Sequence, residues 1–145
     1  MSQTSGEQTA CESRRRTDPW GARVLIVDSS PCIWEFLEHA LAKEPRAEFI
    51  GSASTAEGAL ELVKATEPDV IVTAIAGLAI HTWVPLIRRG YPATRVLVFS
   101  GHCGTRMIKY AFDLGVSGYV AKPATSETIV DAVLAVAAGE TVLLR

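Results

Sequence analysis

The sequence predicts an α/β fold, a doubly wound parallel sheet of five strands built from five successive strand–helix units. Short apolar runs rich in β-branched residues alternate along the chain with longer segments whose apolar residues recur at helical spacing. This alternation is typical of parallel sheets, because each helix carries the chain back to the edge where the next strand begins. The length of 145 residues and the hydrophobic content of 48% suit one domain with a substantial core.

The first unit has the clearest pattern. Residues 24–27 are an unbroken run of valine, leucine and isoleucine, which predicts a strand buried on both faces. Pro31 predicts the start of a helix, because proline suits the first helical position, where the backbone N–H needs no helical partner. The apolar residues that follow fall on one helical face; they are Ile33, Phe36, Leu37, Ala40 and Leu41.

The second and third units are less regular. Residues 49–53 predict a weaker strand, and the helix after it, over residues 55–65, has Ser54 or Thr55 as its expected N-cap. Residues 70–73 predict the third strand. The helix that follows has a less regular pattern, with apolar residues at Trp83, Leu86 and Ile87 and a stop at Gly90.

The last two units have clear boundaries. Residues 96–99 predict the fourth strand, and the helix over residues 105–114 is closed by Gly115, since glycine takes the left-handed conformation that ends many helices. Residues 118–120 predict the last strand. The last helix is expected over residues 126–138, before Gly139.

Charge and composition exclude several classes of function. A net charge of −2 provides no basic face for phosphates, so we expect no direct nucleic-acid binding. Three cysteines without CxxC spacing argue against a disulfide framework or a zinc site. No segment approaches the roughly 18 consecutive apolar residues of a membrane span, so we expect a soluble protein of the reducing cytoplasm. Residues 1–20 are polar, and we expect a flexible tail before a domain over residues 21–145.

The predicted fold determines which residues can form a site. In an open parallel sheet, binding and reactive groups gather at the carboxyl ends of the strands, where the strand order reverses. The residues in these places are Asp28 and Ser29 after the first strand, Ala74 after the third, Ser100 after the fourth and Lys122 after the fifth. Only one of them carries a carboxylate.

Four motifs in this order resemble those of a response-regulator receiver domain. They are residues 24–31 (VLIVDSSP), 68–69 (PD), 98–101 (VFSG) and 118–123 (GYVAKP). The resemblance covers about residues 23–144 and implies a flavodoxin-like, CheY-like fold. The stretch over residues 132–143 is similar to receivers of the NarL/LuxR type, which precede a helix-turn-helix output domain.

The resemblance also implies what the pocket has lost. In that family, an acidic pair after the first strand and an aspartate after the third bind Mg2+, and that aspartate accepts phosphate from a histidine kinase. The matching residues here are Asp28, Ser29 and Ala74, while the family's hydroxyl and lysine are kept as Ser100 and Lys122. A methyl group cannot attack phosphorus, and one carboxylate is a poor magnesium site. We therefore expect a degenerate phosphorylation pocket with no metal, no cofactor and no catalytic residue.

Two rearrangements are expected around the missing carboxylates. Lys122 is expected to pair with Asp28 alone, which balances the charge of the pocket without a metal. The loop after the third strand is unusually apolar for this family. Its Leu78, Ile80 and Trp83 can form an exposed site for a small molecule or partner, or they can pack down over the vacant metal site.

In this family, the fourth helix, fifth strand and fifth helix form a face that serves dimerisation or partner docking. The family's switch aromatic corresponds to Tyr119. Ala132, Val133 and Val136 in the last helix provide more small apolar positions than one buried stripe needs, so an exposed share of them would suit a helix-to-helix contact. Simple core packing of the same residues is the alternative.

These features predict an atypical receiver, a non-enzymatic module of signal transduction and transcription regulation that works without aspartate phosphorylation. It would act through a protein partner or as a homodimer. Three alternatives stay open: a receiver that senses a small molecule, a phospho-accepting receiver in which an aspartate was replaced by Ala74 on purpose, and a flavodoxin-like enzyme. The segment after the first strand has no glycine to let the backbone approach phosphate, which disfavours the last of these.

Overall fold

The computed structural model describes residues 21–145, and within them six parallel strands form one sheet. The strands are β1 (Ala22–Val27), β2 (Ala47–Ala53), β3 (Val70–Thr73), β4 (Arg95–Ser100), β5 (Gly118–Ala121) and β6 (Val142–Leu144). Their order in the sheet is β2-β1-β3-β4-β5-β6. The predicted parallel α/β fold is confirmed. The expected tail over residues 1–20 lies outside the described residues.

The strand count is the one correction to the predicted architecture. β6 was not predicted, and it pairs in parallel with β5 through Gly118–Val142, Tyr119–Leu143 and Val120–Leu144. Three residues are too short a run to give a strand pattern in the sequence. Their extended conformation depends on the neighbouring strand, so tertiary contact rather than local preference determines this element.

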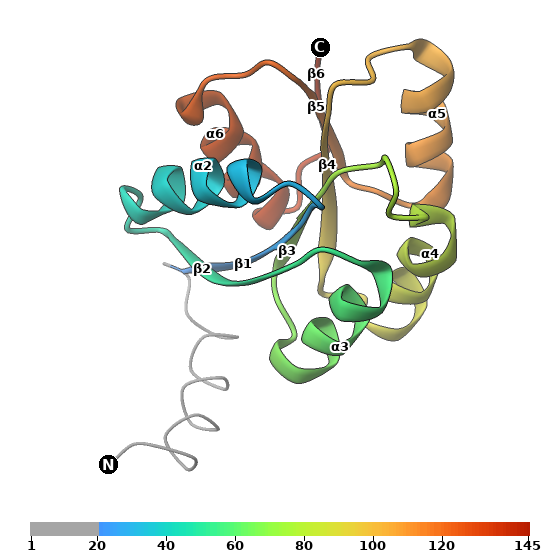
Figure 1. Cartoon of the computed structure of the whole chain (residues 1–145), viewed down its shortest axis with the longest axis horizontal. Coiled ribbons are helices and arrows are strands. Elements are labelled where there is room, and N and C mark those ends of the chain that lie inside the picture. Colours follow the sequence, from blue (N-terminus) through green and yellow to red (C-terminus); the bar gives the residue numbers. More distant parts are fainter. Residues whose placement is uncertain (1–20) are drawn as a thin grey trace.

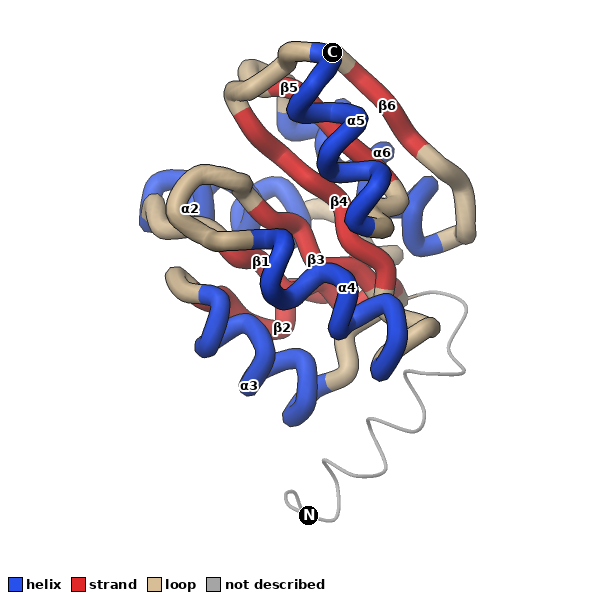
Figure 2. Tube along the Cα trace, turned by 90° about the vertical axis from the view of Figure 1, so that its right-hand side faces the viewer, coloured by secondary structure: helices blue, strands red, loops and turns tan. Residues whose placement is uncertain are grey.

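Helices cover both faces of the sheet, which lies between them in Figure 1. In the described range the helices are α2 (Pro31–Ala42), α3 (Ala56–Thr66), α4 (Ile80–Gly90), α5 (Thr105–Leu114) and α6 (Ser126–Ala137). α2 and α6 lie on one face, and α3, α4 and α5 lie on the other, as Figure 2 shows from the side of α5. The predicted helices are therefore all present.

The sheet divides the core into two clusters. In β1, Val24 and Ile26 point to the face covered by α2 and α6, whereas Leu25 and Val27 point to the face covered by α3, α4 and α5. All four side chains are fully buried, which explains why the sequence of the strand is a continuous apolar run. Burial on both faces also fixes the register of β1 between β2 and β3, at the point where the strand order reverses.

The residues at the helix ends have the roles that the sequence predicts for them. The Thr55 side chain accepts a hydrogen bond from the backbone N–H of Gly58 at 3.0 Å, so Thr55 is the N-cap of α3. Gly115 ends α5 with a φ of 113°. The irregular pattern of α4 has a visible cause, because Pro85 lies inside the helix and Ala79 precedes it with a φ of 49°.

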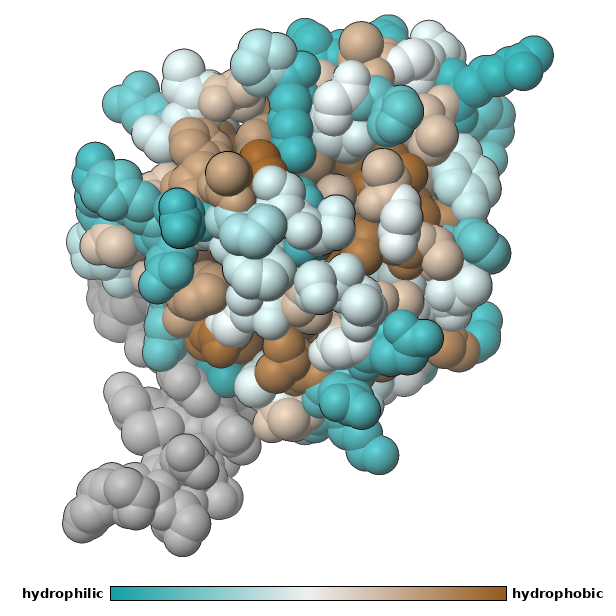
Figure 3. All heavy atoms as spheres, viewed as in Figure 1, coloured by the Kyte–Doolittle hydropathy of each residue, from teal (hydrophilic) through white to brown (hydrophobic). Residues whose placement is uncertain are grey.

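The surface seen in Figure 3 is a mosaic in which hydrophilic side chains separate small apolar areas. Among the described residues, four large hydrophobic side chains are exposed: Leu86, Tyr110, Leu143 and Leu144. None of the helices between residues 21 and 145 has the length and the apolar character that crossing a membrane requires.

Candidate functional site

The five pocket residues named from the sequence lie together at the carboxyl edge of the sheet. Backbone hydrogen bonds join the strand ends there: the N–H of Ala74 donates to the carbonyl of Val27 at 2.9 Å, and the N–H of Lys122 donates to the carbonyl of Ser100 at 2.8 Å. The segments after β1, β3, β4 and β5 are therefore continuous with the sheet. Together they form the site that the strand order predicts.

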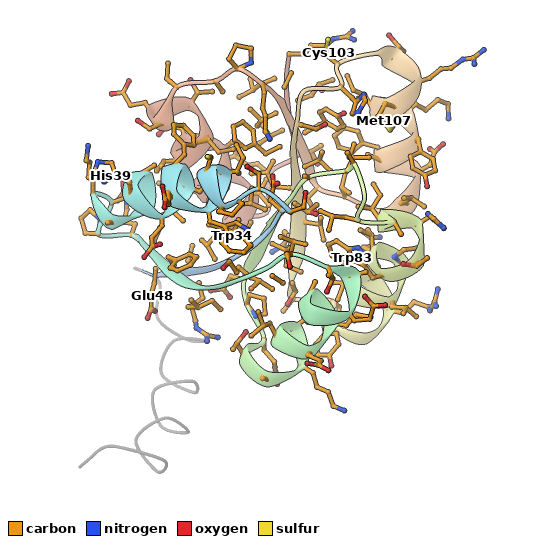
Figure 4. All side chains as sticks on the ribbon, viewed as in Figure 1. Trp34, His39, Glu48, Trp83, Cys103 and Met107 are labelled. Carbon is orange, nitrogen blue, oxygen red and sulfur yellow. The ribbon has the colours of Figure 1, made fainter. Side chains whose placement is uncertain are left out.

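Asp28 is held firmly at the centre of this pocket. The residue is 5% exposed, and its Oδ1 accepts a hydrogen bond from the N–H of Ser30 at 2.9 Å. Its backbone carbonyl accepts a second hydrogen bond, from the indole Nε1 of Trp34 at 2.7 Å. Trp34 extends from α2 toward the strands (Figure 4). These contacts leave Oδ2 of Asp28 directed at the rest of the pocket.

Lys122 meets this carboxylate, as expected from the sequence. Its Nζ lies 3.7 Å from Oδ2 of Asp28 and 5.0 Å from the centre of the Phe99 ring. The ammonium therefore has a carboxylate on one side and an aromatic face on another, and both interactions stabilise a cation. The peptide bond between Lys122 and Pro123 is cis.

Ser29 and Ala74 add no charge to the pocket. Ser29 is exposed and Ala74 is half-buried. A hydroxyl group is neutral and a methyl group has no oxygen, so neither side chain supplies a negative charge. Over residues 21–145, no group of three or more His, Cys, Asp or Glu side chains gathers where it could hold a metal ion. Mg2+ usually keeps several waters and needs one or two carboxylates with phosphate oxygens, and Asp28 alone is already engaged by Lys122.

Ser100 and Tyr119 are connected through the loop after β4. Ser100 is buried, and its Oγ accepts a hydrogen bond from the N–H of His102 at 3.1 Å. Tyr119 is fully buried, and its hydroxyl donates to the carbonyl of the same His102. Burial raises the pKa of the Tyr119 phenol, so the group stays neutral and keeps its proton to donate. The loop is therefore fastened to β4 and β5 at one residue.

The apolar loop after β3 is part of the core. Leu78, Ile80 and Trp83 are 1%, 2% and 0% exposed, and the indole Nε1 of Trp83 donates to the carbonyl of Leu78 at 2.9 Å. Figure 4 shows Trp83 at the start of α4. Of the two readings offered by the sequence, the exposed ligand site is wrong, because these side chains are almost fully buried. They pack with α3, α4, α5 and the sheet.

For the last helix, core packing is the reading that the structure supports, and the exposed helix-to-helix contact is not. Ala132, Val133 and Val136 are at most 3% exposed, and Tyr119 lies in the opposite core cluster, on the other face of the sheet. α6 packs against the sheet and against α2 at the same time, so its buried stripe is wider than one contact requires. The side chains exposed near this face are instead Tyr110 of α5 and the two leucines of β6.

Sequence reasoning missed two contributors to the pocket. Phe99 provides the ring beneath Lys122, and this ring stacks on Phe36 with centroids 6.3 Å apart. Trp34 fixes the backbone of Asp28. The alternation of side chains along β4 could have placed Phe99 on the face of the sheet that α2 covers. No local pattern in the sequence shows that the indole of Trp34 donates to the backbone carbonyl of Asp28.

The Asp28–Lys122 contact can be measured by a double-mutant cycle with Asp28→Asn and Lys122→Met. Asparagine keeps the acceptor for the N–H of Ser30, so the cycle isolates the ion pair. We expect a coupling of about 1–2 kcal/mol in the free energy of unfolding, because the carboxylate is buried and the ammonium only partly exposed. The exposed Lys64 provides the control, and Lys64→Met should show no coupling with Asp28→Asn. Zero coupling for Lys122 would contradict the pair.

Comparison with known proteins gives one consistent result. A family model described as the response regulator receiver domain matches residues 24–134. The transcriptional regulatory protein DegU from Brevibacillus brevis is 32% identical over 120 residues, which are 81% of this chain and 50% of DegU. NarL from Mycobacterium tuberculosis is 32% identical over 127 residues, which are 86% of this chain and 59% of NarL. The chain spans about half the length of these curated relatives.

Solved structures agree with the sequence relatives. The receiver domain of NarL from Mycobacterium tuberculosis is 31% identical and superposes with a TM-score of 0.78, covering 84% of this chain and all of that domain. A two-component response regulator of the LuxR family from Aurantimonas is 30% identical, with a TM-score of 0.77 and coverage of 84% and 89%.

Proposed function

This chain belongs to the response regulator receiver family, and we propose that it serves as a signalling module that is not switched by phosphorylation of an aspartate. The observation that carries the proposal is the pocket itself. Ala74 occupies the acceptor position, and the ammonium of Lys122 lies 3.7 Å from the single remaining carboxylate, that of Asp28. Phosphoryl transfer requires an oxygen nucleophile at the acceptor position and carboxylates for the metal that neutralises developing charge, whereas Ala74 has a methyl group and Asp28 carries the single carboxylate of the five pocket residues.

The charge balance of the pocket supports the same proposal. Here Lys122 already has the carboxylate of Asp28 and the ring of Phe99 as neighbours. Clustered carboxylates about 4 Å apart repel by roughly 4 kcal/mol per pair at an effective dielectric constant near 20. With one carboxylate facing one ammonium, that repulsion is absent and the charge of the pair is balanced without an ion.

The loop after β4 is tied to the sheet at His102. The hydroxyl of Tyr119 and the Oγ of Ser100 both bind the backbone of His102, so the family's switch aromatic is buried and tied to the loop in the unphosphorylated chain. A receiver fixed in this way would signal by the contacts it makes. We propose that those contacts are with a protein partner or a second copy of the chain.

The surface next to the α5–β5–α6 face suits such a contact. Tyr110, Leu143 and Leu144 are between 39% and 47% exposed there. Leu143 pairs with Tyr119 in the sheet, so its side chain lies on the same face as α5. Because the relatives are transcriptional regulators, we propose that the whole protein regulates transcription and that this part is not an enzyme.

Thermal unfolding with and without Mg2+ tests the proposal. A ligand that binds the folded state at ten times its Kd stabilises it by about 1.4 kcal/mol, which raises the midpoint visibly. We expect no change in Tm between EDTA and millimolar Mg2+, at constant ionic strength. Ca2+ at the same concentration controls for general ionic effects. A rise in Tm that appears with Mg2+ and disappears in Asp28→Asn would contradict the proposal.

A further inference from the structure

One edge of the sheet, formed by β6, is open. β6 pairs with β5 on one side, and in the part of the chain that the structure describes no strand lies on its other side (Figure 2). Edge strands expose unpaired backbone N–H and C=O groups, and proteins usually protect them with charged side chains, proline or a bulge. The other edge, β2, has the exposed Glu48 and an irregular register against β1. β6 consists of one valine and two leucines and has none of these devices.

The backbone of Leu143 faces this open edge. The N–H of Val142 donates to the carbonyl of Ser117 at 3.1 Å, so the backbone of Val142 points to β5. In a parallel strand, the N–H and C=O of one residue point to one side and those of the next residue point to the other side. Leu143 therefore directs its donor and its acceptor away from β5. A residue of this kind can form a hydrogen-bonded antiparallel pair, in which two residues exchange both bonds.

The side chains of β6 leave an apolar surface on both faces of this edge. Leu143 is 47% exposed, and its pairing with Tyr119 places it on the α5 face. Leu144 is 42% exposed, and its pairing with Val120 places it on the α6 face. A further strand added to β6 would therefore cover apolar surface on both faces, in addition to pairing with the backbone.

The residues next to β6 determine which strand matches it. Glu140 precedes the strand, Arg145 follows it, and both are exposed. A second copy of β6 placed antiparallel about Leu143 brings Arg145 of each copy opposite Thr141 of the other, one position from Glu140. A parallel placement would instead bring the two Arg145 residues together. Opposite charges at the two ends therefore make this edge complementary to itself in the antiparallel direction, as a two-fold dimer requires.

We propose that β6 pairs antiparallel with β6 of a second copy of the chain, so that two six-stranded sheets join into one continuous sheet. This pairing rests on the proposed function, in which the chain signals through its contacts, and it specifies the partner and the manner of binding. Leu143 would lie at the two-fold axis and exchange two backbone hydrogen bonds with Leu143 of the second copy. A three-residue strand buries less area than the roughly 1,600 Å² of a standard interface, so the dimer should dissociate readily.

Sedimentation velocity of the whole chain, from about 1 μM to about 1 mM, measures this dimer. We expect the monomer to give way to a dimer within that range. In NMR spectra of the same samples, exchange of the Leu143 amide proton should slow as the concentration rises, because the dimer gives this N–H an acceptor. The exchange is read in the unsubstituted chain, so the test holds even if a variant folds poorly.

Leu143→Pro and Leu143→Lys separate the backbone and side-chain contributions. Proline removes the outward N–H, and an edge strand tolerates it where that N–H does not pair within the sheet. Lysine keeps the N–H and places a charge next to its own copy across the two-fold axis. Each should weaken dimerisation about tenfold or more. Leu86→Lys is the matched control, because Leu86 is 44% exposed but belongs to α4, and it should change the dissociation constant less than about twofold.

Charge reversal tests the direction of the pairing. Glu140→Arg should weaken the dimer about threefold, because it places like charges near each other at both ends of the paired strands. Adding Arg145→Glu to the same chain should restore the affinity. If the second reversal does not restore it, the antiparallel direction is wrong.

Three further results would overturn the pairing: a chain that stays monomeric up to about 1 mM, an exchange rate of the Leu143 amide that does not depend on concentration, or equal weakening by Leu143→Pro and Leu86→Lys. These results are distinct from failure of the proposed function. A rise in Tm with Mg2+ contradicts the proposed function, whereas a monomeric chain whose Tm does not respond to Mg2+ contradicts the pairing through β6 alone.

Discussion

Trp83→Ala is expected to lower the free energy of unfolding by about 3–5 kcal/mol, the usual range for removing a buried tryptophan. Trp83 is fully buried between α4 and the sheet, and truncation would leave a cavity in the larger core cluster. It would also leave the carbonyl of Leu78 without the indole that now donates to it. A domain of this size has only about 5–15 kcal/mol of total stability, so the loss would be a large share of it.

Urea unfolding followed by circular dichroism measures this loss without relying on the fluorescence of the removed side chain. Leu86→Ala is the matched control, because Leu86 lies in the same helix but is 44% exposed. Its effect should stay within about 0.5 kcal/mol. The loss of unfolding free energy in Trp83→Phe should fall between the losses in Leu86→Ala and Trp83→Ala. A loss below about 1 kcal/mol for Trp83→Ala would mean that the loop after β3 is not anchored in the core as described.

Restoring the two missing carboxylates, with Ser29→Asp and Ala74→Asp together, is expected to create a magnesium site and a phosphate acceptor. The scaffold for both is in place, because Ala74, Ser100 and Lys122 are joined to the strand ends by backbone hydrogen bonds. In EDTA the double variant should be less stable than the parent chain, since new carboxylates near Asp28 repel it by up to a few kcal/mol. Mg2+ should reverse that loss.

The readouts for this variant are Tm with and without Mg2+, and intact mass after incubation with acetyl phosphate. We expect Tm to rise with Mg2+ and the mass to increase by one phosphoryl group. Ser29→Asn with Ala74→Asn is the control, because asparagine has the shape of aspartate without its charge or nucleophilic oxygen; it should show neither effect. If the aspartate variant also shows neither, the pocket has changed beyond the two missing carboxylates.

The fold could be predicted closely because its signals are local or strictly periodic. Residues buried on both faces, such as those of β1, give unbroken apolar runs. The N-cap at Thr55 and the left-handed Gly115 mark helix ends by their own chemistry. β6 could not be predicted in the same way, because three residues become a strand only by pairing with β5.

One contact of the pocket, between Asp28 and Lys122, was predicted, and the burial around the pocket was predicted less well. Strand ends determine which residues gather, so Asp28 and Lys122 could be paired from the sequence. Which side chains of α6 and of the loop after β3 are buried depends on how α2, α4 and α6 pack on the sheet. The number of apolar residues in a segment does not show how it packs. For Ala132, Val136 and Leu78 the sequence therefore left an exposed position and core packing open as alternatives, and the structure places all three in the core.

Intact-mass spectrometry of the unsubstituted chain after incubation with Mg2+ and acetyl phosphate tests the central claim most directly. The account predicts a single species at the mass of the chain, because position 74 offers a methyl group and the carboxylate of Asp28 is paired with Lys122. A species heavier by one phosphoryl group, located by peptide mapping to the segments around Asp28, Ala74 or Ser100, would contradict it.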